Sequence, residues 1–292
     1  RQELGDATGA AACFRRALEL APDDADARNS LGLALMAKGE SEEAVRTFRA
    51  LTKSRPDYAL GWQNLGNALL QKGDLEGAIA VYRDLVVRSS SAEAFYNLGL
   101  ALKQRDDFAG AEEALRQALR LDPKLSEAHY TLGVVLWQTG RREAARDALT
   151  AAVEARPDYA DAHLMRGTVL KQLGDRDGAL EEFRKTIALH PESAEAHLSV
   201  GQLLQQRGEA EAARTALEEA KRLRLAPAAE GQSRPVRARN GRGSAGEPPD
   251  DGIRDDVHDG EPQVPHWIQR QAGDYRDGCD TDSDAVASEW RR

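Results

Sequence analysis

The chain has 292 residues, of which 41% are hydrophobic, and its formal net charge is −9 at pH 7. This hydrophobic content is enough to bury a core over most of the length, but a mildly acidic chain lacks the basic surface expected of a nucleic-acid-binding protein. The two cysteines, Cys13 and Cys279, are too few and too far apart in the chain for a metal site or a disulfide framework. No apolar run reaches the ~18 residues of a membrane span.

Glycine recurs at a nearly fixed interval within residues 1–225. One glycine column has successive spacings of 34, 33, 34, 34 and 34, at Gly32, Gly66, Gly99, Gly133, Gly167 and Gly201. The pentapeptide Arg-Pro-Asp-Tyr-Ala occurs at residues 55–59 and again at 156–160, three of these periods later. A period of this size indicates an array of structural repeats.

Each period predicts two helices. Leu65 and Leu69 flank Gly66 and make the buried stripe of a first helix, in which the glycine allows a partner helix to approach closely. A second glycine column is expected to close that helix in the left-handed conformation, with Asp106 as the exception. The second helix then carries a small residue and, four positions later, a bulky one, as Ala78 and Tyr82 illustrate.

The predicted elements follow the period along the chain. Residues 1–24 are expected to supply the end of a first helix and then a second helix, which predicts that the chain begins inside a repeat. Full repeats are expected to start near residues 25, 59, 92, 126, 160 and 194. Proline ends a repeat because it lacks the amide hydrogen that a continuing helix needs; these prolines are Pro22, Pro56, Pro123, Pro157 and Pro191.

Helix, tight turn, helix and proline at a period of 34 resemble the tetratricopeptide repeat, and Trp62, Leu65 and Gly66 with Ala78 and Tyr82 match it closely. The resemblance covers residues 1–225. It implies an all-α fold, an α-solenoid in the form of a right-handed superhelix of helix-turn-helix repeats. It also implies a protein-protein interaction scaffold or adaptor that binds a peptide or a partner protein in a concave groove. No catalytic motif is present, so neither an enzyme nor a cofactor is expected.

The resemblance places four columns of each first helix on that groove. Tyr130 and Trp137 are seven positions apart on one helix, and Tyr96 is one repeat away in the column of Tyr130. Because tyrosine and tryptophan dominate binding hot spots, we interpret the three as a candidate binding cluster. The alternative is that the rings pack against the neighbouring repeat.

Amide side chains form the second set of candidates. Glutamine fills one groove column and could bond a peptide backbone, although glutamine is also an ordinary helix former; we name Gln71, Gln104, Gln138 and Gln172. Asn64 and Asn97 resemble part of the asparagine ladder of O-linked N-acetylglucosamine transferase. Asn67 and Asn97 match the asparagines of a chaperone-binding carboxylate clamp. The cations of that clamp are missing, since Gln63, Glu127 and Thr131 stand there, so an acidic C-terminal peptide is not the expected ligand.

Three histidines, His129, His163 and His197, are each one period from the next. Adjacent repeats would hold them about 10 Å apart, whereas the ligands of one zinc ion lie about 2 Å from it. They share a column with Trp62 and Phe95, so we expect them to pack between helices and expect no metal site.

Residues 226–292 differ in composition from the rest of the chain. They contain no Leu, Lys, Phe or Met and cannot bury enough apolar surface to offset the entropy of ordering, which predicts a disordered low-complexity tail. The abrupt change after Leu225 alternatively indicates a shifted reading frame. A second interpretation of the function follows: the repeats are the targeting or substrate-recruiting region of a larger enzyme, for example a glycosyltransferase, whose catalytic domain lies outside these residues.

Overall fold

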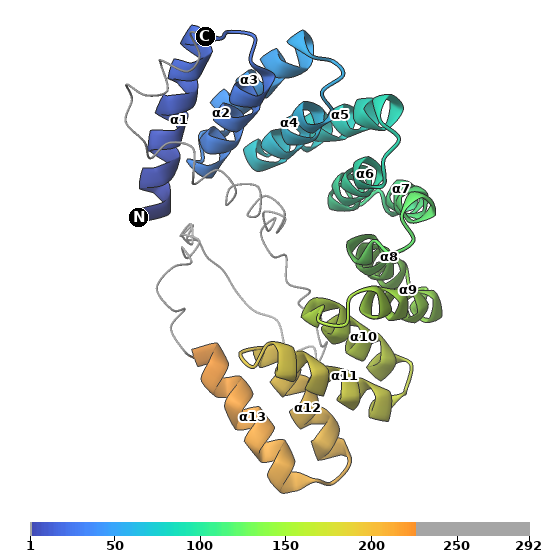
Figure 1. Cartoon of the computed structure of the whole chain (residues 1–292). Coiled ribbons are helices and arrows are strands. Elements are labelled where there is room, and N and C mark those ends of the chain that lie inside the picture. The colour runs from blue at the N-terminus through green and yellow to red at the C-terminus, as the bar shows by residue number, and fades with distance from the viewer. Residues whose placement is uncertain (1, 226–292) are drawn as a thin grey trace, which may run out of the picture.

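The computed structural model describes residues 2–225, and their side chains from Ala7 onward. This part of the chain contains thirteen helices and no strand. The helices follow one another along an open arc, with α1 at one end and α13 at the other (Figure 1). The fold is therefore an all-α solenoid. The tail predicted for residues 226–292 lies outside the described residues.

The helices are short and similar in length, apart from the longer α1 and α13. Their bounds are α1 Gln2–Leu20, α2 Ala25–Ala37, α3 Ser41–Ser54, α4 Ala59–Lys72, α5 Leu75–Arg88, α6 Ala92–Gln104, α7 Phe108–Leu121, α8 Ser126–Gln138, α9 Arg142–Ala155, α10 Ala160–Gln172, α11 Arg176–Leu189, α12 Ala194–Gln206 and α13 Ala210–Leu225.

The even-numbered helices are the first helices of the repeats. Figure 1 shows α6 and α8 on the inner side of the arc, with α7 and α9 outside them. Successive first helices also touch, since α2 contacts α4 and α8 contacts both α6 and α10. We call the surface of these first helices toward the inside of the arc the inner face.

From Gly39 onward, the second glycine column closes the first helices in the left-handed conformation, as the sequence predicted. Gly5 was expected to end a first helix within residues 1–24 but instead lies inside the continuous helix α1, so that expectation was wrong. Gly73 has φ of +86° and its amide donates to Leu69 and Leu70 carbonyls. Asp106, the exception in sequence, adopts φ of +61°. Aspartate therefore reproduces the turn, at the conformational cost that a side chain brings to this region.

The first glycine column lets the second helix of each repeat lie against the first. A Cβ atom on Gly66 would stand 2.4 Å from Cε1 of Tyr82, and one on Gly133 would stand 2.6 Å from Cγ of Leu149. Tyr82 and Leu149 are buried. Each repeat therefore packs a bulky side chain of its second helix onto a glycine of its first.

A side chain six positions after each repeat-ending proline hydrogen-bonds the carbonyl oxygen of that proline. Trp62 Nε1 donates to Pro56 at 3.0 Å. The Nε2 atoms of the three histidines lie 2.9 to 3.0 Å from the carbonyl oxygens of their prolines, and the Arg28 guanidinium donates to the carbonyl oxygen of Pro22. The histidine column thus holds the loop against the following helix, a role that adds to the expected packing.

Candidate protein-binding surface

Three tyrosine side chains gather where α6, α8 and α10 succeed one another. The rings of Tyr130 and Tyr159 have centroids 5.1 Å apart and an interplanar angle of 46°. Tyr96, Tyr130 and Tyr159 are all half-buried. Burial raises the pKa of Tyr96 to about 12, against a hydrogen bond with Thr131 that lowers it. Burial also raises the pKa of Tyr130 to about 12. Both hydroxyls are therefore neutral at physiological pH.

Arg156 joins this tyrosine cluster to α8. Its Cζ lies 3.7 Å from the centroid of the Tyr159 ring, and its Nη1 donates to Oε1 of Glu127 at 2.9 Å. Its Nε is buried and has no partner among the described residues. Arg156 and Tyr159 extend the cluster beyond the three aromatic residues that the sequence singled out.

Both copies of the repeated pentapeptide tie a loop to the first helix of the preceding repeat. In the first copy, the Tyr58 hydroxyl donates to Oδ1 of Asp26 at 2.9 Å. In the second copy, Arg156 donates to Glu127. Asp26 and Glu127 occupy the same position of their helices. The recurrence of the pentapeptide was the sequence signal for Arg156 and Tyr159.

Trp137 and two of the four glutamines link successive repeats. Trp137 Nε1 donates to Oε1 of Gln172 at 3.1 Å. Gln71 Nε2 donates to the carbonyl of Met36 at 3.0 Å. Gln104 and Gln138 are exposed and form no hydrogen bond with a described residue. The glutamine column therefore divides into two inter-repeat links and two solvent-exposed amides.

The three candidate asparagines are buried. Asn64 Nδ2 donates to Oδ1 of Asn29 at 2.9 Å, and Asn67 Oδ1 accepts from the Tyr82 hydroxyl at 2.5 Å. The Nδ2 atoms of Asn67 and Asn97 have no partner within residues 2–225. A buried amide hydrogen without an acceptor costs about 1–3 kcal/mol. The described part of the chain therefore does not compensate the desolvation of those two donors.

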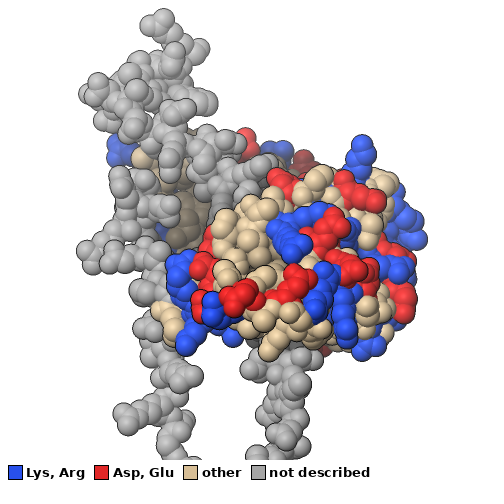
Figure 2. All heavy atoms as spheres, turned by 90° about the horizontal axis from the view of Figure 1, so that it is seen from below, with Lys and Arg blue, Asp and Glu red and all other residues tan. Residues whose placement is uncertain are grey.

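Charged side chains stand at both ends of the first helices. Glu93, Asp161 and Glu195 lie in the first turns, are exposed, and form no ion pair with a described residue. Lys103 and Lys171 lie in the last turns of α6 and α10, are half-buried, and are likewise unpaired within the described range. Burial lowers the pKa of Lys103. On the face drawn in Figure 2, by contrast, acidic and basic residues are interspersed.

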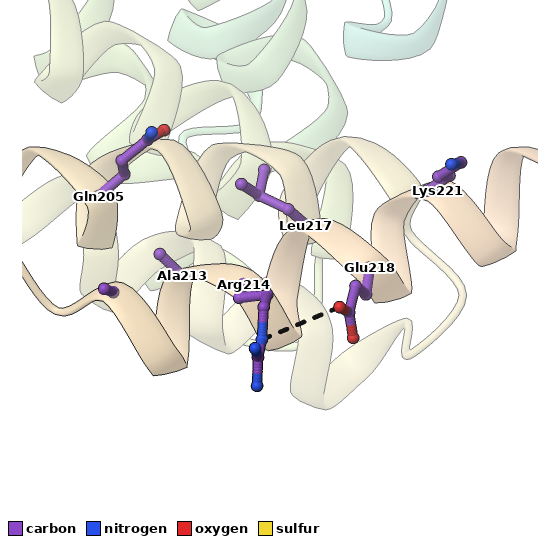
Figure 3. A pocket seen from close by; sticks show the side chains of 7 residues that line it. Gln205, Ala213, Arg214, Leu217, Glu218 and Lys221 are labelled. Atoms are coloured by element: carbon purple, nitrogen blue, oxygen red, sulfur yellow. Dashed lines mark ion pairs between the residues drawn. The ribbon is translucent and has the colours of Figure 1, made fainter.

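A hollow lies at the α13 end of the arc, far from the tyrosine cluster. Figure 3 shows Leu217 and Ala213 beside the ion pair of Arg214 and Glu218, whose nearest atoms are 3.9 Å apart. Its lining comes from α12 and α13 alone and holds none of the candidate residues.

Comparison with known proteins establishes the family. A family model described as tetratricopeptide repeat matches residues 31–94, 96–160 and 164–230, and a model described as TPR repeat matches residues 3–39. The chain belongs to the tetratricopeptide repeat family. Among curated proteins, no sequence matches this tetratricopeptide repeat protein. Within the described residues, no helix is both long and apolar enough to cross a membrane.

Several solved structures resemble this tetratricopeptide repeat protein. A crystal structure of MamA is 29% identical with a TM-score of 0.52, covering 55% of this chain and 94% of MamA. PilF of Pseudomonas aeruginosa is 20% identical with a TM-score of 0.62, covering 70% and 93%, a likeness of fold. YrrB, described as a TPR protein with an unusual peptide-binding site, is 24% identical with a TM-score of 0.50, covering 63% and 95%. Family and neighbours together support a protein-interaction scaffold.

Proposed function

We propose that this protein is a non-catalytic scaffold that binds a peptide or a partner protein on its inner face, with Tyr96, Tyr130 and Trp137 at the contact. The observation that carries the proposal is the half-burial of these three rings on the successive first helices α6 and α8. The family relationship supports it, and so does the peptide-binding site in the description of YrrB.

Partial burial suits these rings to binding. Each ring is held on one side by its own chain, so docking a partner onto the other side immobilises little further side-chain freedom. Tyrosine and tryptophan bury large areas at low entropic cost, because each has two side-chain torsions. The neutral tyrosine hydroxyls can also accept or donate hydrogen bonds. We therefore assign these rings the role of anchors.

The amides are proposed to contact the backbone of the bound segment. Gln104 and Gln138 are exposed and can turn toward a ligand. Asn67 and Asn97 carry amide hydrogens that lack an acceptor in the described part of the chain. Both Nδ2 atoms are buried, so a peptide carbonyl would supply that acceptor once the neighbouring side chains move aside. Gln71, Gln172 and Asn64 are proposed to position their neighbours, because their hydrogen bonds already run between repeats.

The test removes the anchors from the full chain. A partner is captured with the wild-type protein and identified, and its dissociation constant is measured for the wild type and for Tyr96→Ala/Tyr130→Ala/Trp137→Ala. Loss of three anchors worth about 1–2 kcal/mol each predicts at least a hundredfold weakening.

The matched control truncates three exposed apolar side chains of second helices, in the variant Val87→Ala/Leu121→Ala/Leu189→Ala. This control should bind like the wild type. Unchanged affinity of the aromatic variant, with its helical circular dichroism intact, would show that the partner binds elsewhere.

A further inference from the structure

One carboxylate per repeat stands at the same position of four successive first helices. These are Glu93, Glu127, Asp161 and Glu195, each one period from the next. Glu127 pairs with Arg156, while the other three form no ion pair with a described residue. An acidic residue in a first turn stabilises its helix through the helix dipole. That effect explains the residue type, but it leaves the negative charges unneutralised.

These charges lie close to the tyrosine cluster. Besides burial, the charges of Asp161 and Glu195 raise the pKa of Tyr130. Asp161 lies two residues after Tyr159, whose ring centroid is 5.1 Å from that of Tyr130. Burial raises the pKa of Tyr159, and the charge of Asp161 acts in the same direction. The rings of Tyr130 and Tyr159 therefore share their surroundings with carboxylates that no described cation neutralises.

The chain itself shows what a cation does in this setting. Arg156 places its guanidinium 3.7 Å from the centroid of the Tyr159 ring while it pairs with Glu127 at 2.9 Å. A cation over a tyrosine ring and beside a carboxylate gains from both the ring quadrupole and the ion pair. Asp161 stands in the place of Glu127 one repeat later, near Tyr130, without such a cation among the described residues.

The spacing of the carboxylates indicates the form of the ligand. First helices of neighbouring repeats lie about 10 Å apart, and an extended chain advances about 3.3 Å per residue. In the polyproline II conformation, which has three residues per turn and a rise of about 3.1 Å per residue, side chains three positions apart share a face and match successive repeats. Asn97 independently points to a bound backbone, because it lies one helical turn after Glu93 on the same face of α6, is 5% exposed, and holds an Nδ2 without an acceptor in the described range.

We propose that the inner face binds a segment of a partner protein in the extended polyproline II conformation, whose Lys or Arg side chains recur at intervals of three or six residues and pair with Glu93, Asp161 and Glu195 beside the tyrosine rings. This inference rests on the proposed scaffold function and names the chemistry of its partner. The unpaired Lys103 and Lys171 lie in the last turns of their helices, whereas the carboxylates lie in the first turns. The lysines therefore do not occupy the row of carboxylates, which stays free for basic side chains of a partner.

The test uses three fluorescent synthetic peptides of about twelve residues, which span three to four repeats when extended. One has Lys at every third position among Ser and Ala, the second has the same composition with its lysines contiguous, and the third has Glu in place of Lys. Fluorescence anisotropy gives the affinity of each for the full chain, for Asp161→Asn/Glu195→Gln, and for the control Glu143→Gln/Glu154→Gln. The control removes two carboxylates of α9 that are exposed and unpaired within the described residues.

The spaced Lys peptide should bind more tightly than the other two. Each exposed ion pair contributes a few-fold in affinity, so the Asp161→Asn/Glu195→Gln variant should bind it about tenfold more weakly, and added salt should reduce the difference. The α9 control should bind it like the wild type. Both substituted side chains in α10 and α12 are exposed, so the variant should stay folded, and its urea midpoint should fall only by the small helix-dipole contribution of each charge.

Equal affinity for the spaced and contiguous peptides, preference for the Glu peptide, absence of binding, or an unaffected Asp161→Asn/Glu195→Gln variant would each overturn the inference. The scaffold proposal fails separately. A natural partner that is lost with the aromatic variant but retained by the carboxylate variant removes this inference alone.

Discussion

Glu182 is buried among three basic side chains, and its removal should destabilise the repeat formed by α10 and α11. Its side chain is 2% exposed and accepts from Arg166 and His163 at 2.7 Å and from Lys185 at 3.2 Å. Burial disfavours the charged form, but the hydrogen bond from His163 and the charge of Arg166 outweigh it and lower the pKa of Glu182. His163 Nε2 lies 2.9 Å from the carbonyl oxygen of Pro157 and its Nδ1 lies 2.7 Å from the carboxylate, so both ring nitrogens face acceptors.

The loss of unfolding free energy in each variant depends on which charged side chain remains buried without its partner. Glu182→Ala leaves Arg166, which is 18% exposed, without its carboxylate; breaking a buried pair in this way costs about 3 kcal/mol. Arg166→Leu leaves Glu182 with His163 and Lys185 as partners and should cost about 2 kcal/mol. The double variant restores the residue types of the preceding repeat, where Leu132 and Ala148 stand at these positions. It should lie within about 1 kcal/mol of the wild type, because apolar replacement of a buried pair is often neutral.

Urea unfolding of the four proteins at pH 7, followed by circular dichroism, measures these differences. Hydrogen exchange of the α10 and α11 amides localises them, since stability in a solenoid is close to a sum of local terms. The reasoning is refuted if the two single losses simply add in the double variant, because contacting residues should show a coupling above about 2 kcal/mol.

The same set of proteins gives a pH dependence. The folded-state pKa of Glu182 lies below its ordinary value of 4.5. The stability it contributes is therefore present above about pH 4.5 and is lost as the pH falls through the folded-state pKa. The difference between wild type and Glu182→Ala should be full at pH 7 and shrink below pH 4.5. A difference that grows on acidification would contradict the sign.

Three further substitutions test the turns and the helix contacts by their urea midpoints. Asp106→Gly should stabilise the protein by about 1 kcal/mol, because glycine adopts the left-handed conformation without the cost of a side chain; a loss would show that the aspartate has another role. Gly133→Ala should cost about 2 kcal/mol, because the new Cβ would stand 2.6 Å from Leu149 Cγ; no loss would mean that Leu149 moves freely. Trp62→Phe should cost about 1 kcal/mol, because the carbonyl of Pro56 loses its donor; an unchanged midpoint would show that water replaces the indole.

The fold class could be predicted from the sequence because its constraints are local and repeated. Tyr82 requires a glycine at position 66, and a left-handed turn favours a glycine at position 73. A site of this kind requires the same residue in each repeat, so it appears in the sequence as a periodic column. The local pattern did not reveal that Asp106 adopts the turn as well. Aspartate tolerates positive φ, but most aspartates adopt other backbone conformations, so the residue type alone does not predict the turn.

The candidate site was only partly predictable. Periodicity identified Tyr96, Tyr130 and Trp137, but Tyr159 and Arg156 come from a loop whose contact with α8 depends on how two repeats stack. The Glu182 cluster shows the same limit. Arg166 stands out in a leucine column, but its partner lies on the following helix at a distance that no motif encodes.

The residues six positions after the prolines show how one hydrogen bond can unite side chains that look unrelated in sequence. Arginine, tryptophan and histidine differ in size and charge, yet each supplies an N–H that reaches the proline carbonyl. Phe95 has no such N–H, and it follows the loop that has no proline and is one residue shorter than the loop before α4. In this chain, therefore, a side chain with an N–H occurs at this position in each repeat that follows a proline, and the repeat without the proline lacks it. The histidine column is accounted for by this bond, and His163 alone adds a second partner because Glu182 replaces the alanine of the preceding repeat.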